Sequence, residues 1–541
     1  MTSPQTHDRP RAEARWRLWE WPVPIRGMAT TLLPYTVPPD AAVSLENVYV
    51  DQGVVRRRFG WVKVGDDLDN PVCRIMRVFT STGNERLFVL TTTSLYEWDY
   101  ANSSWVVRAN NVFNGDPGVP VSFTVHTNSN LYIANGRNNL YEYNLQNNTG
   151  GFVGISFFRS PAAVASIASR LVVFNVEDTS GMRRPNRVVY SAPHGKFDSS
   201  ENVGMIDLID PSDIILNVVT FRDFVIIRRS SSVWAMSPTD AVAISGTGGI
   251  LSSVPLVFEF KVVGRGDICE SPKSLLATNE DVYFVSGRDL RRLRAGAFET
   301  VLPIGQSLRE LFANLTDEDM REVNIGYDYK STNIFVSIPV PQDTGEQSFL
   351  VRFSPRVEGR PSMTKVTKRR VTAMGYGTVS FRAADFDGLG STYGTFEGMQ
   401  GLTFDSFGGG RMSGIMFGAG KKVFMEGEGF ADSDGLIRSS WTTSVSNFGD
   451  PWYKVVERII VFVKRGGGFL TVRLGRSFDG ITIEWVGSQT KAIGSAPQVA
   501  FDWSSREAPM WVVEVSSEGA EDLQIGSILA YWRPTSPGGA R

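Results

Sequence analysis

Few residues in this chain have the types and spacing that catalysis or metal binding needs. The histidines are His7, His126 and His194 and the cysteines are Cys73 and Cys269, and none has a second histidine or cysteine at ligand spacing. We expect His126 to be a half-buried, hydrogen-bonded strand residue and both cysteines to be small strand residues. No HExxH, GxSxG or Walker-type loop occurs. We therefore expect no metal site, no cofactor and no enzymatic activity.

Two aspartate-rich segments, residues 385–388 (DFDG) and 432–435 (DSDG), resemble fragments of calcium loops. Neither has the spaced carboxylate that completes an EF-hand, so we interpret both as Asp-Gly turns. The glycines at 408–410 are followed by Arg-Met-Ser, which favours a turn over a phosphate-binding loop.

Positive charge is balanced along the chain as a whole. Its 55 Lys and Arg against 57 Asp and Glu give a net charge of -2, so general adhesion to nucleic acid or anionic lipid is not expected. Local basic clusters are expected to form solvated faces or to pair with acids of neighbouring subunits, with phosphate contact as the alternative. These clusters are Arg56-Arg57-Arg58, Arg183-Arg184, Arg228-Arg229, Arg291-Arg292 and Lys368-Arg369-Arg370.

The elements that would position these residues are strands in a repeating pattern. From about residue 70, apolar strand pairs joined by turns recur, and Tyr96, Tyr141, Val188 and Trp234 mark equivalent positions 45 to 47 residues apart. A four-stranded unit at this period is typical of a β-propeller blade, which predicts six or seven blades between residues 70 and 435. A string of β-sandwiches is the alternative, since no Gly-His or Trp-Asp signature marks the blades.

Two segments interrupt the repeats. Residues 307–323 place Leu308, Phe312 and Leu315 at helical spacing, with Thr316 as the N-cap of a further turn, which predicts a short helical cap. Residues 387–414 interleave glycines with large apolar side chains, and we expect this Gly-aromatic ribbon to narrow a passage or to dock against a neighbouring subunit. Its large side chains are Tyr393, Phe396, Met399, Phe404 and Phe407.

The chain is expected to be all-β, with a propeller followed by a C-terminal β-sandwich. Residues 1–30 are expected to form an N-terminal arm without a signal peptide. Residues 31–435 are expected to form the propeller, including a hairpin at 44–64 that is either a closing hairpin or an ordinary first hairpin of blade one. Residues 436–541 form the sandwich, with alternating Val455, Ile459, Val461 and Val463 and turns at 466–468 and 479–480. No run approaches the roughly 18 apolar residues of a membrane span, so we expect a soluble protein.

The stretch SLENVYVDQGVVRRRFGW, residues 44–61, predicts a hairpin that turns at Asp51-Gln52-Gly53. With the preceding residues it resembles the N-terminal segment of phage virion proteins of the tail-nozzle and packaged-DNA-stabilisation type. The matching positions are Pro38, Pro39, Ala42, Asn47, Val48, Asp51, Gly53, Arg58 and Gly60. A second resemblance covers residues 391–449, although Thr-Phe-Glu and Thr-Phe-Asp stand where that family often has Trp-Asp.

The resemblance implies a β-propeller subunit of a phage tail, a structural nozzle or head-to-tail protein of the virion made in the host cytoplasm. It implies a homohexameric ring beneath the head-tail connector, with connector and tail proteins as partners. Its channel would retain and then release the packaged double-stranded DNA, and a near-neutral or acidic lining would let DNA slide during ejection.

Two rival functions stay open. One is a receptor- or glycan-binding tail propeller, possibly glycan-cleaving through carboxylates that face the propeller axis, in which Trp16, Trp19 and Trp21 stack on sugars. These tryptophans suit an anchoring arm equally well. The other rival is a cellular scaffold propeller, which the phage-like hairpin argues against.

Overall fold

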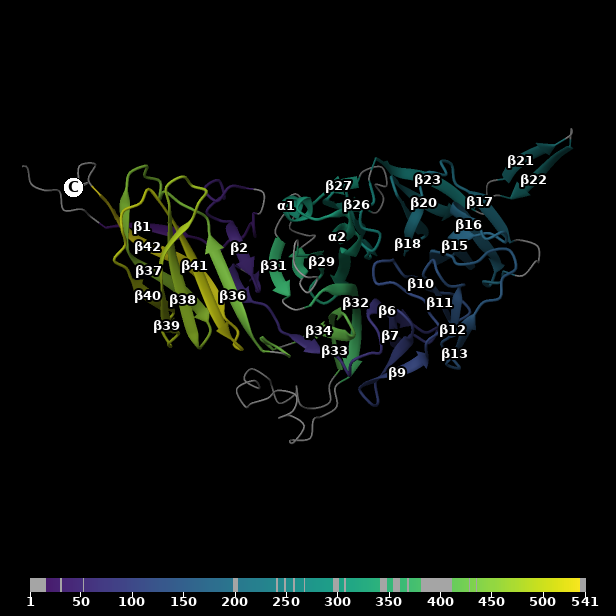
Figure 1. Cartoon of the computed structure of the whole chain (residues 1–541), viewed down its shortest axis with the longest axis horizontal. Coiled ribbons are helices and arrows are strands. Elements are labelled where there is room, and N and C mark those ends of the chain that lie inside the picture. Colours follow the sequence, from purple (N-terminus) through teal and green to yellow (C-terminus); the bar gives the residue numbers. More distant parts are fainter. Residues whose placement is uncertain are drawn as a thin grey trace, which may run out of the picture. The chain divides into compact units, whose positions relative to one another are not determined.

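The computed structural model describes most of the chain and divides it into two compact units (Figure 1). The described residues are 16–29, 32–51, 53–197, 203–239, 242–247, 250–255, 258–266, 268–294, 301–305, 308–340, 348–353, 361–366, 369–380, 411–427, 429–433 and 435–535. The larger unit is Phe59–Gly435. The smaller unit combines Met1–Arg58 with Leu436–Arg541.

In its described part, the larger unit contains seven groups of four antiparallel strands, named sheets 1 to 7 in chain order. Sheet 1 contains β6 (Val72–Phe79), β7 (Glu85–Thr91), β8 (Leu95–Asp99) and β9 (Ser104–Ala109). Sheet 2 contains β10 (Ser122–Val125), β11 (Asn130–Ala134), β12 (Tyr141–Asn144) and β13 (Thr149–Phe152). Sheet 3 contains β14 (Ala163–Ile167), β15 (Arg170–Glu177), β16 (Arg183–Pro193) and β17 (Gly204–Asp207). Sheet 4 contains β18 (Ile215–Phe221), β19 (Phe224–Arg229), β20 (Ser232–Pro238) and β23 (Phe258–Arg265).

Sheet 5 contains β24 (Leu275–Ala277), β25 (Asp281–Ser286), β26 (Asp289–Arg294) and β27 (Val301–Pro303). Sheet 6 contains β28 (Asn324–Asp328), β29 (Asn333–Pro339), β30 (Ser348–Phe353) and β31 (Pro361–Val366). Sheet 7 contains β32 (Val371–Ser380), β33 (Arg411–Ala419), β34 (Lys422–Glu426) and β5 (Trp61–Lys63), and a two-residue strand, β35 (Ala431–Asp432), follows. An additional hairpin, β21 (Val242–Thr247) with β22 (Ile250–Pro255), lies between the last two strands of sheet 4, and it accounts for the longer spacing of 56 residues from Trp234 to the equivalent Leu290 of sheet 5.

The seven sheets pack in chain order, and the last packs against the first. The first strand of each sheet contacts the first strand of the next, from β6 to β32, and β32 contacts β6 in turn. Sheets 7 and 1 approach each other closely, because a Cβ on Gly418 would lie 2.6 Å from Val72 and one on Gly375 would lie 2.8 Å from Ile75. Buried apolar side chains fill the spaces between neighbouring sheets.

The last strand of sheet 7 comes from the start of the larger unit. Strand β5 pairs with β34 through Trp61↔Glu426 and its neighbours. The sheet is thus completed by residues that precede sheet 1 in the chain.

The two predicted helical turns are present. Helices α1 (Arg309–Ala313) and α2 (Asp317–Glu322) lie between sheets 5 and 6, with Phe312 and Met320 buried. Thr316 caps α2 in a capping box, in which its hydroxyl accepts from the Asp319 backbone and the Asp319 carboxylate accepts from the Thr316 backbone.

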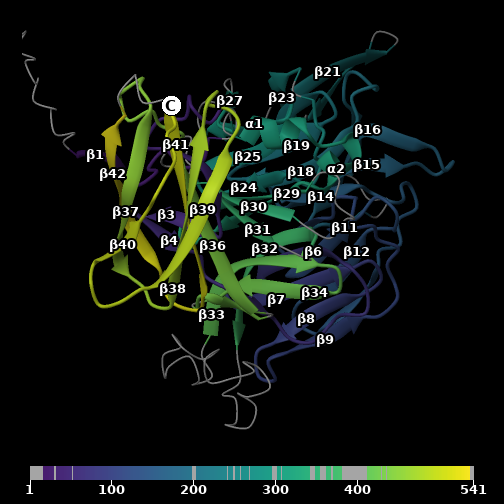
Figure 2. The ribbon, with the colours of Figure 1, turned by 60° about the vertical axis from the view of Figure 1, so that its left-hand side comes forward.

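The smaller unit consists of two antiparallel sheets, visible in yellow and yellow-green with purple N-terminal strands in Figure 2. One has the order β3 (Val48–Asp51), β4 (Val54–Arg57), β42 (Gln524–Pro534), β37 (Lys454–Arg465) and β40 (Gln498–Asp502), with β1 (Arg17–Trp21) also on β42. The other has the order β2 (Ala42–Glu46), β36 (Gly435–Thr443), β41 (Met510–Gly519), β38 (Phe469–Ser477) and β39 (Glu484–Ala492).

Several expected boundaries need correction. Strand β1 of the expected N-terminal arm and the hairpin β3–β4 of the expected propeller both pair with β42, so they belong to the smaller unit, and only β5 serves the larger one. The boundary after Gly435 coincides with the expected one. The alternation in β37 also shifts: Val455 is only partly buried and Val456 is buried, because β-bulges interrupt its pairing with β42.

Candidate functional site

Asn47 and Arg58 close the base of the hairpin that carries the family-like residues. Asn47 has a φ of 55°, a left-handed conformation that asparagine tolerates, and it separates β2 from β3. Its Oδ1 accepts a hydrogen bond from Arg58 Nε at 2.9 Å, and its backbone carbonyl accepts from the Arg58 backbone at 3.0 Å. Its Nδ2 donates to the Arg438 carbonyl at 2.7 Å. These two residues therefore tie the hairpin to β36.

The glycines of this segment have different roles. Gly53 has a φ of 75° at the turn after the exposed Asp51, and open space surrounds it. Gly60 has no such conformation, but a Cβ there would lie 1.7 Å from the Ala431 carbonyl oxygen. Its backbone bonds to Gly429 and Gly427, so Gly60 is required where two backbones approach closely in the larger unit.

Arg56 and Arg57, which are neighbours in β4, point to opposite sides, as the strand geometry predicts. Arg56 forms a two-bond ion pair with Asp522 at 2.8 and 3.1 Å. Arg57 lies inside and donates to the Ser439 and Ser517 hydroxyls and to the Glu521 carbonyl. Burial lowers the pKa of Arg57 to about 10, although nearby carboxylates oppose the shift.

The expectation that the basic clusters form solvated faces is wrong for half of their members. Arg229 donates to the carbonyls of Ile209, Asp210 and Asp213, and Arg292 pairs with the buried Asp281 at 2.6 Å. Burial removes these guanidinium groups from contact with DNA. Six are at least nine-tenths buried: Arg57, Arg58, Arg228, Arg229, Arg292 and Arg369.

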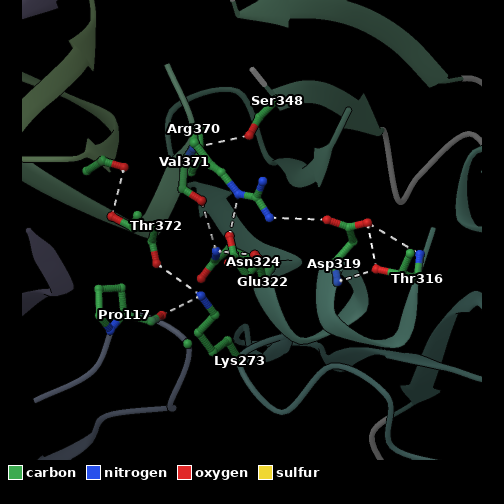
Figure 3. A network of polar contacts seen from close by, with 12 residues as sticks. Pro117, Lys273, Thr316, Asp319, Glu322, Asn324, Ser348, Arg370, Val371 and Thr372 are labelled. Atoms are coloured by element: carbon green, nitrogen blue, oxygen red, sulfur yellow. Dashed lines mark hydrogen bonds and ion pairs between the residues drawn. The ribbon is translucent and has the colours of Figure 1, made fainter. Parts of the chain in front are cut away.

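Lys273 is the centre of a buried polar network in the larger unit (Figure 3). Its Nζ donates to the Pro117 carbonyl at 2.7 Å and to the Thr372 carbonyl at 3.3 Å, and the side chain is 4% exposed. Lys273 precedes β24, Pro117 lies on the loop into β10, and Thr372 lies in β32. Because sheets 5, 2 and 7 are not neighbours in the cycle, the ammonium group must lie inside it.

Charged side chains surround this ammonium group. Burial lowers the pKa of Lys273 to about 8, and Glu322 opposes the shift. Arg370 bonds Glu322 at 2.5 Å and Asp319 at 3.2 Å, which connects the network to the α2 cap. Cys73 also faces Lys273, and burial raises the pKa of its thiol to about 12, so this thiol stays protonated. The arrangement fastens three sheets together at one end of the cycle.

His126 is more deeply buried than predicted and only partly satisfied. Its Nδ1 bonds the Ser166 hydroxyl at 2.8 Å, whereas its Nε2 is buried without a partner. Burial, and then the charge of His194, lower its pKa. Cys269 also differs from the prediction, since it follows β23 in a loop. Among the described residues, no group of three or more His, Cys, Asp or Glu is arranged to hold a metal ion.

The N-terminal tryptophans divide between anchoring and exposure. Trp21 is fully buried and its Nε1 donates to the Ser444 carbonyl at 3.0 Å, while Trp19 packs on Phe448 at 5.7 Å between ring centroids. Trp16 is 49% exposed. The structure therefore supports the anchoring interpretation for Trp19 and Trp21.

A cluster of exposed apolar side chains lies elsewhere on the smaller unit, and we name it the aromatic end surface. Lys454 holds its backbone, donating to the carbonyls of Asp450, Trp452 and Pro509 at 2.7 to 2.8 Å. Tyr453 contacts Phe478, and the Tyr35 backbone bonds Gly480. About half of each side chain is exposed in Tyr35, Trp452, Tyr453, Phe478 and Ile481.

Sequence reasoning missed an acid-to-hydroxyl contact that recurs in the sheets. Asp69, three residues before β6, accepts from Ser94 at 2.6 Å and from Thr91 and Thr93 at 3.0 Å. Burial opposes ionisation of Asp69, yet these bonds outweigh it and lower its pKa. Asp213, two residues before β18, likewise accepts from the hydroxyls of Ser230 and Ser232 and from the Ser231 backbone. The sequence signal for this contact is an Asp shortly before the first strand of a sheet, together with a run of Ser and Thr residues after the second strand.

The structure does not describe the ribbon residues that we expect to form a channel or assembly loop. These residues are Tyr393, Phe396, Met399, Phe404 and Phe407. Within the described residues, no helix is long and apolar enough to cross a membrane.

No family model matches the chain, and no curated protein matches it.

Proposed function

We propose that the larger unit is a seven-bladed β-propeller and the smaller unit a β-sandwich. The four-stranded sheets, the cycle of contacts between their first strands and the completion of sheet 7 by β5 support the propeller. The two antiparallel sheets of the smaller unit support the sandwich.

On this architecture, the chain is a structural subunit of a phage tail that assembles into a ring around the DNA exit channel. The observation that carries the proposal is the fate of the family-like residues: Asn47, Arg58 and Gly60 are all used to fix backbone, as shared residues of a structural protein should be. Such positions tolerate substitution poorly for steric and hydrogen-bonding reasons.

The DNA channel runs between copies and not through the axis of one copy. Lys273 fastens sheets 2, 5 and 7 inside the cycle and closes one end of it with an ammonium group and two carbonyls. A ring of several copies, each contributing an outer surface, leaves a wider passage. The burial of Arg57, Arg229 and Arg292 keeps these cations away from phosphates that pass the surface.

Ring formation tests this proposal. The purified 59.7 kDa chain would be studied by mass photometry and negative-stain electron microscopy, alone and with its candidate connector. We expect closed rings of about six copies, alone or on the connector. A chain that stays monomeric with every connector of its own genome would refute it. Asn47→Ala, which loosens the hairpin, should reduce ring formation more than the exposed-site control Lys422→Ala.

A second candidate function is receptor or glycan binding by the aromatic end surface. Exposed, rigidly held Trp and Tyr rings are suited to stacking on sugars. A glycan array probed with the wild type, with Trp452→Ala and with the control Trp16→Ala would test it. Binding lost only in Trp452→Ala would favour this function over a purely structural one.

A further inference from the structure

Arg74 is a cation without a counterion in the larger unit. It lies in β6, opposite Leu90 of β7. Its Nε is buried without a hydrogen-bond partner, and its guanidinium carbon lies 5.6 Å from the centroid of the Phe123 ring of β10. Burial alone lowers its pKa to about 10, so no carboxylate compensates it.

The position of Arg74 places this charge inside the cycle of sheets. Its strand is the first of sheet 1, and the first strands contact one another around the cycle. Phe123 lies on the first strand of sheet 2, and it packs against the core between the two sheets. Thr372 Oγ1 donates to the Val72 carbonyl at 2.7 Å, and the Thr372 carbonyl binds Lys273. Arg74 therefore lies two residues along β6 from Val72, which Thr372 connects to Lys273.

Arg74 keeps part of its surface accessible although protein surrounds it. Arg228 provides the contrast, because its three nitrogens also lack partners but it is only 1% exposed, with no space for a ligand. Arg74 is thus within reach of water or a small solute, whereas Arg228 is not.

An unpaired charge that is largely enclosed by protein is costly, and arginine cannot escape the cost by losing its proton near neutral pH. The guanidinium edge offers parallel N–H donors that match two oxygens of one oxyanion, while Phe123 covers a ring-stacking face. We propose that Arg74 binds a small inorganic oxyanion, of the size and charge of phosphate, inside the cycle of sheets. This inference does not depend on the proposed function.

Thermal unfolding of the full chain tests the site. Sodium phosphate and sodium sulfate would be titrated against sodium gluconate at constant ionic strength, with unfolding followed by tryptophan fluorescence. Binding to the folded state alone raises Tm with saturation, by about 2 °C or more at full occupancy. The variant Arg74→Met should lose this response. The matched control Arg137→Met, which removes one charge from a surface pair with Asp116, should keep it.

Two results would overturn the proposal: no saturable rise in the wild type, or an equal rise in Arg74→Met. Should Arg74→Met fail to fold, ³⁵Cl NMR on the wild type decides the matter. Chloride line broadening that phosphate reverses at a stoichiometry of about one supports the site, and broadening that phosphate leaves unchanged refutes it.

Discussion

The buried amine of Lys273 predicts an unusual dependence of stability on pH. Replacing Lys273 with methionine keeps much of the volume and removes the titrating group. The pKa of Lys273 is about 8 in the folded chain, against 10.5 for an unperturbed lysine. The folded state therefore loses this proton at a lower pH than the unfolded state does.

The sign follows from proton counts. Between pH 8 and 10.5 the unfolded wild type holds more protons than the folded one, so its free energy of unfolding rises with pH relative to Lys273→Met. At about 1.4 kcal/mol for each pKa unit, the full change is about 3 kcal/mol. Below pH 8 the difference between the two proteins is constant. Two opposing effects set this constant difference. Methionine leaves the Pro117 and Thr372 carbonyls unpaired, which destabilises the variant by about 1–3 kcal/mol for each carbonyl, whereas removing a buried charge stabilises it.

Urea unfolding of both proteins at pH 7, 8, 9 and 10, followed by circular dichroism, measures this difference. Lys422→Met is the matched control, because Lys422 is exposed in β34 of the same unit and its removal should give a flat profile. A wild-type-minus-Lys273→Met difference that does not change between pH 7 and 10 would refute the reasoning. So would an equal slope in the control.

Three further predictions concern single positions. Gly60→Ala should prevent normal folding of the larger unit, because the alanine Cβ would overlap the Ala431 carbonyl oxygen. Gly53→Ala should lower the free energy of unfolding by only about 1 kcal/mol, because Gly53 has a left-handed backbone but open space around it; thermal unfolding distinguishes the two variants. Asn47→Gly should lower the free energy of unfolding by about 1–3 kcal/mol, because the hydrogen bonds to Arg58 and β36 are lost. Asn47→Ala should lower it further, because alanine is strained in the left-handed conformation. Urea unfolding measures both values, and equal values would contradict the strain. Asp213→Asn should lower the free energy of unfolding by about 1–3 kcal/mol at pH 7. Hydrogen bonds outweigh burial and lower the pKa of Asp213, so the difference from the wild type should fade as the pH falls below the ordinary aspartate range. A difference that does not depend on pH would argue against this cause.

Local signals predicted much of the fold. The strand pairs, the capping box at Thr316 and the turn at Gly53 depend on residues a few positions apart, so their periodicity and turn chemistry are visible in the sequence. The 45 to 47 residue spacing likewise marks successive sheets, and its extension coincides with the β21–β22 hairpin.

Long-range partners were not predictable in the same way. Strand alternation required Arg57 to face away from Arg56, but it did not reveal that Ser439 and Ser517 receive it. Lys273 gave no signal, because its ligands are backbone carbonyls, which every residue has. The solvated-face expectation for arginine pairs failed for a related reason: carbonyl oxygens and buried aspartates satisfy these cations inside the fold.

The arrangement of the two units also sets an order of events on the ribosome. Strands β1, β3 and β4 precede the whole larger unit in the chain, yet their partner β42 follows it. Strand β5 likewise waits for β34, which follows it by about 360 residues. The larger unit can therefore be completed before β42 has emerged, whereas the smaller unit can close only afterwards. A chain that terminates before β42 would keep β1, β3 and β4 without this partner and open to aggregation, so errors that stop translation there should yield insoluble products.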